Sequence, residues 1–412
     1  MKIAIIGSGI SGISSALICS YNNLQTTLFE KNNYLGGHTR TISINHSGKK
    51  ISVDTGFIVL NERTYPNLLK FFAYLGVEKE KSDMSFAASI IKNSKNLEYG
   101  CKNLSAVFAN KKNLIDIRFL KCLYDIFSFF KKAKNNAKDI TLRELIIKLN
   151  LSDYFRDFFI IPIASAIWSS KPNKILDYPA EVFINFFENH GLLSFTNQPQ
   201  WFFVKNNSKD YVEKFQKNFK GEIKLNTKII AVEKLSNGKI EVKTNEGVHI
   251  FDKVIFASHG DQTFNILKKQ SKKQKAILKN FAYQENHITV HKDVSFMPKN
   301  KKCWSSWNYK IKDNEHYLTY WMNNLQNIDK NYPVFVTLNA KGLINKNDVF
   351  DEYNFEHPLY NFAMIQAQKE ISTIQGEDNI YYAGAYLGYG FHEDGIKSAI
   401  QVAEKMNLKL PW

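Results

Sequence analysis

The sequence predicts an α/β protein of two interleaved domains. One is a discontinuous Rossmann-like domain, a parallel sheet flanked by helices. The other is an α+β domain with a mostly antiparallel sheet and a helical insertion. Three observations predict this class: a glycine fingerprint between two strand-like runs, apolar residues at helical spacing through the middle of the chain, and polar–apolar alternation in later segments. A chain of 412 residues is too long for one compact core and fits two domains.

The N-terminal fingerprint begins the first domain. Residues 2–7 form a β-branched apolar run typical of a buried parallel strand, a helical pattern follows, and residues 26–30 form a second strand that ends at Glu30. The turn between them has the spacing GxGxxG and comprises Gly7, Gly9, Ser11 and Gly12. Its glycines let a pyrophosphate approach the helix N-terminus, and a carboxylate at Glu30 accepts hydrogen bonds from a ribose 2′-hydroxyl. The unit predicts binding of FAD or NAD rather than NADP.

A second glycine-rich segment follows closely, as KNNYLGGHTRT over residues 31–41, and SVDTGFIVL follows over residues 52–60. The order GxGxxG, E-x5-GG-x3-T and D-x-G resembles the flavin-containing amine oxidase superfamily, which includes protoporphyrinogen oxidases and carotenoid desaturases. The resemblance implies FAD as the cofactor, because this longer molecule runs on past the first βαβ unit.

The resemblance also implies which residues contact FAD. In the N-terminal part they are Lys31, Gly36, Gly37, His38, Thr39, Arg40, Thr55, Gly56 and Phe57. Relatives carry arginine where His38 stands, so Arg40 is expected to take over the cationic role near the pyrophosphate. The backbone of Val232 is expected to contact the adenosine part of FAD. Ala257 and Ser258 are expected at the end of a strand that re-enters the parallel sheet.

The C-terminal passage AGAYLGYGFHEDGIKSAI, residues 383–400, predicts a glycine-rich turn and a helix. The resemblance brings Gly384 and Ala385 to the pyrophosphate. A helix N-terminus at the flavin N1–C2=O edge stabilises the negative charge of the reduced ring. The N–H groups expected there are those of Asp394, Gly395 and Ile396.

The same resemblance sets the domain limits. The FAD-binding domain is expected to comprise residues 1–76, 206–260 and 375–412, and the substrate domain residues 77–205 and 261–374. The first part of the substrate domain is expected to be a largely helical insertion.

One segment of the insertion, NLIDIRFLKCLYDIFSFFKKAKNN at residues 113–136, has apolar residues at helical spacing and lysines at its end. Two interpretations stay open. The helix lies on a membrane surface as a basic amphipathic helix, or, the one we favour, it is a core helix whose last lysines complement the helix dipole. Residues 161–170 and 176–195 predict buried helices that wall an apolar cavity.

Four segments between residues 285 and 339 predict antiparallel strands. The aromatic residues clustered on them line a substrate pocket over the flavin or form an ordinary core, and they include Trp304, Trp307, Tyr320 and Trp321. Amine oxidases often carry a lysine on the first of these strands. Here that place falls at Asn286 or His287, which argues against amine oxidation.

Longer stretches resemble one subfamily, namely DTGFIVLNERTYPNLLKFFAYLGV, CWSSWNY, HPLY and GAYLGYGFHEDG. Its members are FAD-dependent oxidoreductases associated with cyclopropane-fatty-acyl-phospholipid synthases. The resemblance implies oxidation or desaturation of a methyl-branched, cyclopropane or furan-type fatty acid, free or in phospholipid, by hydride transfer to flavin N5. It also implies a cyclopropane-fatty-acyl synthase-like methyltransferase as functional partner. The alternatives are amine or protoporphyrinogen oxidation, and a flavin-bound accessory protein without catalysis.

The catalytic candidates lie in the C-terminal turn. Tyr389, His392 and Glu393 are the side chains expected nearest the flavin ring. His392 suits a general base, because an unperturbed imidazole titrates near operating pH. The structural alternatives are that His392 orders the turn, that Glu393 caps a helix starting at Gly395, and that Tyr389 packs on the flavin.

Composition limits the partners. The net charge of +16 favours anionic partners, yet the sequence has no nucleic-acid motif and no zinc spacing. The four cysteines are scattered without a CxxC pair, which predicts no metal site and fits a reducing cytoplasm. The cysteine content favours a cytoplasmic protein, and the resemblance implies a flavoprotein that acts on a lipid. Attachment to the inner face of the membrane is an open alternative.

Overall fold

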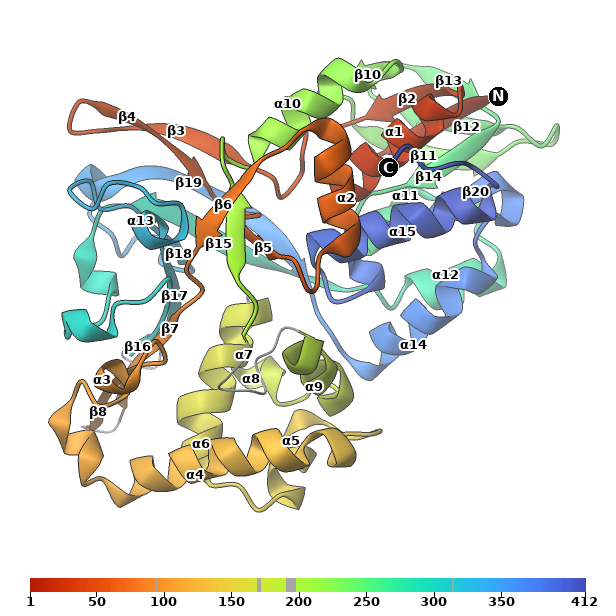
Figure 1. Ribbon diagram of the computed structural model, residues 1–412. Coiled ribbons are helices and arrows are strands. Elements are labelled where there is room, and N and C mark those ends of the chain that lie inside the picture. The colour runs from red at the N-terminus through yellow and green to blue at the C-terminus, as the bar shows by residue number, and fades with distance from the viewer. Residues whose placement is uncertain (93–94, 169–171, 190–197, 313–314) are drawn as a thin grey trace.

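The computed structural model describes residues 1–92, 95–168, 172–189, 198–312 and 315–412. Two large sheets and a layer of helices make up its architecture (Figure 1). A wholly parallel five-stranded sheet has the order β10-β2-β1-β14-β20. Its strands are β1 (Lys2–Ile6), β2 (Gln25–Phe29), β10 (Glu222–Lys224), β14 (Lys253–Phe256) and β20 (Ile380–Tyr382). These come from distant parts of the chain, which confirms the discontinuous Rossmann-like fold.

Both faces of the parallel sheet are covered, which is why its central strand is apolar from Ile3 to Ile6. Ile3 and Ile5 pack into a core shared with helices on one side, and Ala4 and Ile6 belong to the core on the other. The helices are α1 (Ile10–Tyr21), α2 (Pro66–Leu75), α10 (Lys209–Asn218) and α15 (His392–Lys405). The opposite core includes an antiparallel sheet of β11 (Ile229–Lys234), β12 (Ile240–Thr244) and β13 (Val248–Phe251).

Both chain termini lie beside the parallel sheet (Figure 1). The side chain of Asn22, at the end of α1, bonds the backbone of Lys409 twice, at 2.8 Å through Nδ2 and 3.1 Å through Oδ1. The C-terminal segment is therefore held against the N-terminal βαβ unit.

The second large sheet has seven strands in the order β19-β15-β18-β17-β16-β7-β8. Its pairs are antiparallel except β16 with β7, which confirms the prediction of a mostly antiparallel sheet. The strands are β7 (Phe86–Lys92), β8 (Lys95–Gly100), β15 (Tyr283–His291), β16 (Trp307–Lys312), β17 (Glu315–Trp321), β18 (Phe335–Leu338) and β19 (Val349–Pro358).

The helical insertion begins later than expected. Its first part supplies β7 and β8 to the seven-stranded sheet and β6 (Lys79–Ser82) to a small sheet with the order β5-β9-β6. The described helices then run from α3 to α9: α3 (Leu104–Val107), α4 (Ile117–Lys132), α5 (Leu142–Lys148), α6 (Asp153–Phe155), α7 (Ile161–Trp168), α8 (Pro172–Ile175) and α9 (Ala180–Asn189). The predicted helices at 161–170 and 176–195 correspond to α7 and α9, and their ends at 169–170 and 190–195 lie outside the described residues.

The remaining elements join these layers. They are β3 (Thr41–His46), β4 (Lys49–Asp54), β5 (Val59–Asn61), β9 (Trp201–Val204), α11 (Gly260–Ile266), α12 (Lys272–Leu278), α13 (Met322–Leu325) and α14 (Phe362–Glu370). The antiparallel ribbon of β3 and β4 packs its Ile44, Ile51 and Val53 into the core of the seven-stranded sheet. Because this ribbon belongs to the N-terminal segment, the two predicted domains share a core there, and their limits stay a prediction.

Candidate cofactor and substrate site

A cavity of about 910 Å³ connects the edge of the parallel sheet with the layer of helices. One end is formed by the fingerprint turn and the end of β2, and the other by apolar side chains of the seven-stranded sheet, α7 and α9. The apolar end is lined by Phe86, Ile163, Ile167, Trp168, Phe186, Trp307 and Tyr320. The predicted helical walls and the predicted nucleotide turn thus meet in one space.

The fingerprint turn is shaped to receive a ligand. Gly7 has φ +100°, and a Cβ on it would lie 2.8 Å from the carbonyl oxygen of Ala257. A Cβ on Gly12 would lie 1.9 Å from the carbonyl oxygen of Gly7, so this glycine lets α1 pack against the turn. Gly9 lines the cavity, and a Cβ there would meet nothing within 4 Å. The space above Gly9 at the N-terminus of α1 therefore fits a pyrophosphate.

Glu30 is fixed at the end of β2 by three donors. Its Oε2 accepts from the backbone N–H of Ser8 at 3.1 Å and from Ser8 Oγ at 2.6 Å, and its Oε1 accepts from the N–H of Asn32 at 2.9 Å. The carboxylate lines the cavity while it is held. Each carboxylate oxygen takes more than one hydrogen bond, so Glu30 fits the predicted contact to a ribose.

Most of the predicted cofactor residues line this cavity. They are Gly7, Gly9, Ser11, Glu30, Lys31, Gly36, Gly37, His38, Gly56, Phe57, Ala257, Ser258, Gly384 and Ala385. Three predicted cofactor residues are not part of the described lining of the cavity, namely Gly12, Thr39 and Thr55. Gly12 provides the close packing of α1, and the hydroxyl of Thr55 donates to the carbonyl of Arg40 at 3.1 Å.

Two predicted contacts need correction. Arg40 lies outside the described lining, because its guanidinium pairs with Asp351 at 2.7 Å and lies 4.1 Å from the ring centre of Tyr353. Val232 is fully buried, and its carbonyl accepts from the N–H of Lys268 at 2.8 Å. The cavity instead reaches this strand at residues 227–229, at the start of β11.

The C-terminal helix begins three residues before the expected Gly395. Because α15 starts at His392, the N–H of Gly395 already donates to the carbonyl of Phe391 at 3.1 Å. Asp394, Gly395 and Ile396 therefore lie outside the described lining, and it is Phe391 and His392 that line the cavity. A Cβ on Gly395 would lie 2.6 Å from Cγ2 of Ile10, so this glycine permits the contact between α15 and α1.

Asp394 holds the turn before α15. Its Oδ2 accepts from the N–H of Phe391 at 2.9 Å, and a Cβ on Gly388 would lie 2.3 Å from its Oδ1. Burial raises the pKa of Asp394 to about 7. The carboxyl group of Asp394 therefore holds the turn before α15, and its charge changes near neutral pH.

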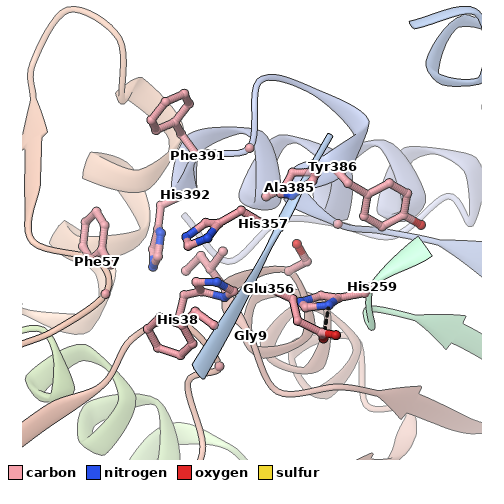
Figure 2. A pocket seen from close by; sticks show the side chains of 18 of the residues that line it. Gly9, His38, Phe57, His259, Glu356, His357, Ala385, Tyr386, Phe391 and His392 are labelled. Atoms are coloured by element: carbon pink, nitrogen blue, oxygen red, sulfur yellow. Dashed lines mark ion pairs between the residues drawn. The ribbon is translucent and has the colours of Figure 1, made fainter. Parts of the chain in front are cut away.

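His392 is held in place by a ring contact and two hydrogen-bonding partners. Its ring stacks on Phe57, with centroids 3.7 Å apart (Figure 2). Its Nε2 lies 3.0 Å from Oγ1 of Thr39 and 3.2 Å from the hydroxyl of Tyr211. Burial lowers the pKa of His392 to about 3. A general base is most effective when its pKa lies near the operating pH, so the geometry favours the alternative in which His392 orders the turn and positions Phe57.

Glu393 does not face the cavity. Its carboxylate accepts from the N–H groups of Asn67 at 3.1 Å and Leu68 at 3.0 Å, and from Nδ2 of Asn67 at 2.6 Å. Those N–H groups are the unpaired donors at the start of α2. Glu393 therefore caps α2 rather than α15, and the predicted catalytic role has no support from this position. Tyr389 does line the cavity, 6.2 Å from Phe186 between ring centres.

His38 lines the cavity together with two histidines that the sequence did not single out, His259 and His357. His38 stacks on Phe355 at 4.3 Å between ring centres, and Nδ1 of His259 lies 3.3 Å from Oε2 of Glu356 (Figure 2). Burial lowers the pKa of His357 to about 4, and holds that of His38 well below its usual value. Both rings are neutral at physiological pH, and the hydrogen bond from His259 lowers the pKa of Glu356.

Two of the four aromatic residues expected at a substrate pocket line the cavity. Trp307 and Tyr320 line the cavity and meet edge to face at 4.8 Å. Trp304 and Trp321 lie outside the described lining and pack on each other at 5.3 Å, and Nε1 of Trp304 donates to the carbonyl of Pro298 at 2.9 Å. Both side chains are partly buried, outside the described core clusters.

Comparison with known proteins agrees with this description. Residues 5–75 match a family model described as an NAD(P)-binding Rossmann-like domain. A carotenoid phi-ring synthase of Chlorobaculum tepidum is 31% identical over 140 residues, which are 32% of this chain and 22% of that protein. The chain thus matches about a fifth of the length of that curated relative.

Solved structures share the fold over nearly the whole chain. The CLA-producing fatty acid isomerase from P. acnes has a TM-score of 0.68 at 11% identity, with 98% of each chain covered. A protein from Exiguobacterium sp. 255-15, provisionally described as a protoporphyrinogen oxidase, has 0.70 at 14% identity and the same coverage. Cyclohexylamine oxidase from Brevibacterium oxydans IH-35A has 0.66 at 13% identity, covering 98% of this chain and 99% of its own.

These findings confirm the predicted fold class and agree with FAD as the cofactor, which the cradle over Gly9 and the carboxylate of Glu30 fit. Among the described residues, no group of three or more histidine, cysteine or acidic side chains is arranged to hold a metal ion. In the same part of the chain, no helix is both long and apolar enough to cross a bilayer.

Proposed function

We propose that this protein is an FAD-dependent oxidoreductase that oxidises or desaturates a lipid acyl chain. The substrate class is a methyl-branched, cyclopropane or furan-type fatty acid, carried in phospholipid. The observation that carries the proposal is the single cavity whose one end fits a dinucleotide and whose other end is apolar. A fatty acid isomerase with the same fold supports an acyl substrate.

The apolar end suits a hydrocarbon chain. The side chains of Phe86, Ile163, Ile167 and Phe186 offer it no charge, and they come from two layers that enclose it. Burying each methylene of an acyl chain is worth about 0.8 kcal/mol, so such walls bind a chain without a polar anchor. The charged residues of the described lining lie elsewhere, at the fingerprint end and on β15 and β19, namely Glu30, Lys31, Lys228, Glu285 and Glu356.

Amine oxidation has less support. Asn286, one of the two places where amine oxidases often carry lysine, is buried, and it bonds His357 at 2.9 Å and Asn339 at 3.1 Å. Within the described lining, lysine occurs as Lys31 and Lys228, both at the fingerprint end. A cavity lysine of the amine oxidase kind is therefore missing from this part of the chain.

Different parts of the site would have different roles in the reaction. Bound FAD supplies the hydride acceptor. The N-terminus of α15 lies at the cavity with His392, and the positive end of its helix dipole would stabilise negative charge there. The neutral imidazole of His392 positions Phe57, and the apolar walls keep water from the reacting C–H bond. A cyclopropane-fatty-acyl synthase-like methyltransferase in the cytoplasm is the kind of enzyme that would supply the modified chain.

The test is an anaerobic titration of the purified flavoprotein. We expect phospholipid with methyl-branched or cyclopropane chains to bleach the flavin absorbance, and mass spectrometry to find an acyl product that has lost two hydrogens. Phospholipid with straight saturated chains, primary amines and protoporphyrinogen serve as comparison substrates. Bleaching by an amine or by protoporphyrinogen alone, or protein that holds no flavin, would overturn the proposal.

A further inference from the structure

Helix α4 is apolar on two opposite faces. Phe119, Cys122, Ile126 and Phe129 are buried against the helical layer, as a core helix requires. The outer face carries a second apolar stripe that faces solvent. Its members are Ile117, Leu120, Tyr124 and Phe127, which are 81%, 41%, 65% and 59% exposed. The spacing of three or four residues puts them in one row along the helix.

The stripe continues into the segment before the helix. Leu114 is 53% exposed, and Ile115 is 81% exposed. Exposed apolar residues are normally scattered singly over a protein surface, and a contiguous group marks an interaction site. We call the group made by Leu114, Ile115, Ile117, Leu120, Tyr124 and Phe127 the α4 face.

Cations surround the α4 face. Lys111, Lys112, Lys121, Lys131 and Lys132 are exposed along the same segment. The nearby acids are engaged with the protein itself. Asp116 caps α4 and pairs with Arg118 at 3.0 Å. The buried Asp125 pairs with Lys121 at 3.1 Å and accepts from the N–H of Ser152 at 3.0 Å, so Lys111, Lys112, Lys131 and Lys132 carry the unneutralised charge of this segment. The segment therefore presents an apolar row within a positively charged border.

We propose that the α4 face docks on an anionic lipid bilayer. Apolar side chains in a row enter the boundary between headgroups and acyl chains, and flanking lysines meet anionic headgroups. A second copy of the chain is a poorer occupant, because the two lysine borders would meet and each chain already carries +16. The inference deepens the proposed function and rests on it for the identity of the substrate.

Helix α4 lies close to the helices that line the apolar end of the cavity. Phe129 on its buried face packs on Phe155 of α6 at 5.3 Å and on Phe183 of α9 at 6.2 Å. The next helices inward, α7 and α9, supply Ile163 and Phe186 to the apolar end of the cavity. Figure 1 shows α4 along the outer edge of this layer, away from the parallel sheet. A bilayer on the α4 face would thus lie one helical layer from the apolar end.

The test is flotation of the purified full-length flavoprotein with vesicles of phosphatidylcholine, with or without phosphatidylglycerol. We expect binding to the anionic vesicles that weakens as salt is added. The variant Ile117→Ser/Phe127→Ser is expected to lower partitioning by about tenfold or more, because apolar burial drives insertion. The matched control is Leu343→Ser/Phe362→Ser, which alters side chains that are 59% and 46% exposed elsewhere on the surface.

The outcomes separate this inference from the proposed function. Equal partitioning of the two variants, or no binding to anionic vesicles, overturns the docking face. So does a change from dimer to monomer in Ile117→Ser/Phe127→Ser, measured by light scattering. A soluble short-chain acyl substrate should bleach the flavin of this variant as fast as that of the wild type. If the wild type binds vesicles but no acyl substrate bleaches it, the docking face stands and the proposed function fails.

Discussion

The two ends of the cavity are built on different principles. At the fingerprint end, three glycines within six residues shape the backbone, and a Cβ at Gly7 or Gly12 would strike a carbonyl oxygen. At the apolar end, the walls come from side chains of β7, β16, β17, α7 and α9, which lie far apart in the sequence. The first end depends on backbone sterics, and the second on the total volume and polarity of its side chains.

This difference determines what each end tolerates. A backbone cradle has no alternative packing, because a carbonyl cannot move aside without breaking the strand or helix that holds it. A wall of mixed apolar side chains can be repacked at modest cost as long as volume and polarity are kept. Substitutions at the fingerprint end should therefore abolish the site, whereas those at the apolar end should change what it accepts.

The sharpest test compares two glycines of the fingerprint. Gly12→Val should lower the free energy of unfolding by about 4 kcal/mol or more, the range of severe backbone clashes. Gly9→Val should cost about 1 kcal/mol, the effect of a poor N-cap residue on α1, yet the protein should lose its flavin. Urea unfolding and the flavin absorbance measure the two effects. If Gly9→Val kept its flavin, the space above Gly9 would not be the cofactor cradle.

A smaller loss is expected at the ribose contact. Glu30→Ala removes a charged acceptor from the cavity, and hydrogen bonds to charged groups are worth roughly 1.5–3 kcal/mol. The dissociation constant of FAD should rise by about tenfold to a hundredfold on that estimate. Glu285→Ala is the matched control, because Glu285 is an acid that lines the same cavity from β15. Equal weakening in both variants would show a general charge effect in place of a ribose contact.

The fingerprint end could be predicted from sequence residue by residue, because its information is local. Strand, turn, helix and terminal acid lie within thirty residues, and the spacing of Gly7, Gly9 and Gly12 leaves little freedom. The register of later elements was harder to predict. The adenosine contact was expected at Val232, whereas the cavity touches β11 at Ile229. Helix α15 was expected to start at Gly395 and starts at His392, because the sequence marks helix ends only weakly.

The apolar end could be predicted only as a type of surface. Trp307 and Tyr320 are paired across β16 and β17, so they share a face, whereas Trp321 follows Tyr320 and points to the other side. Trp304 precedes the strand altogether. The target of Glu393 could not be foreseen, because the N-terminus of α2 lies 325 residues away in sequence from this carboxylate.

Narrowing the apolar end should change substrate choice without loss of cofactor. Ile163→Trp places a larger ring on the wall contributed by α7. We expect full flavin content and a rise in KM of about tenfold for long acyl chains, since a misfit in an apolar pocket is worth roughly 1–3 kcal/mol. Short acyl chains should be oxidised as by the wild type. Loss of flavin in this variant would contradict the separation of the two ends.

The last expected effect concerns stability alone, and it arises at the turn before α15. Burial raises the pKa of Asp394 to about 7, well above that of an aspartate in the unfolded chain. The folded protein therefore binds an extra proton between pH 4 and 7, and the contribution of Asp394 to stability falls as the pH rises through this window. In Asp394→Asn the amide oxygen still accepts from the N–H of Phe391, but the group no longer titrates.

The measurement is the free energy of unfolding in urea at pH 5 and at pH 8. The wild type should lose more stability than Asp394→Asn over this interval, by an amount of about 1–3 kcal/mol on the conversion of 1.36 kcal/mol per pKa unit. Burial lowers the pKa of His357 and His392, which acts in the opposite direction, but both histidines are present in both proteins and cancel in the difference. Identical pH dependence in the two proteins would mean that Asp394 is already ionised at pH 5. In that case a carboxylate would accept from the N–H of Phe391 at both pH values, and the stability of the turn would not depend on pH in this range.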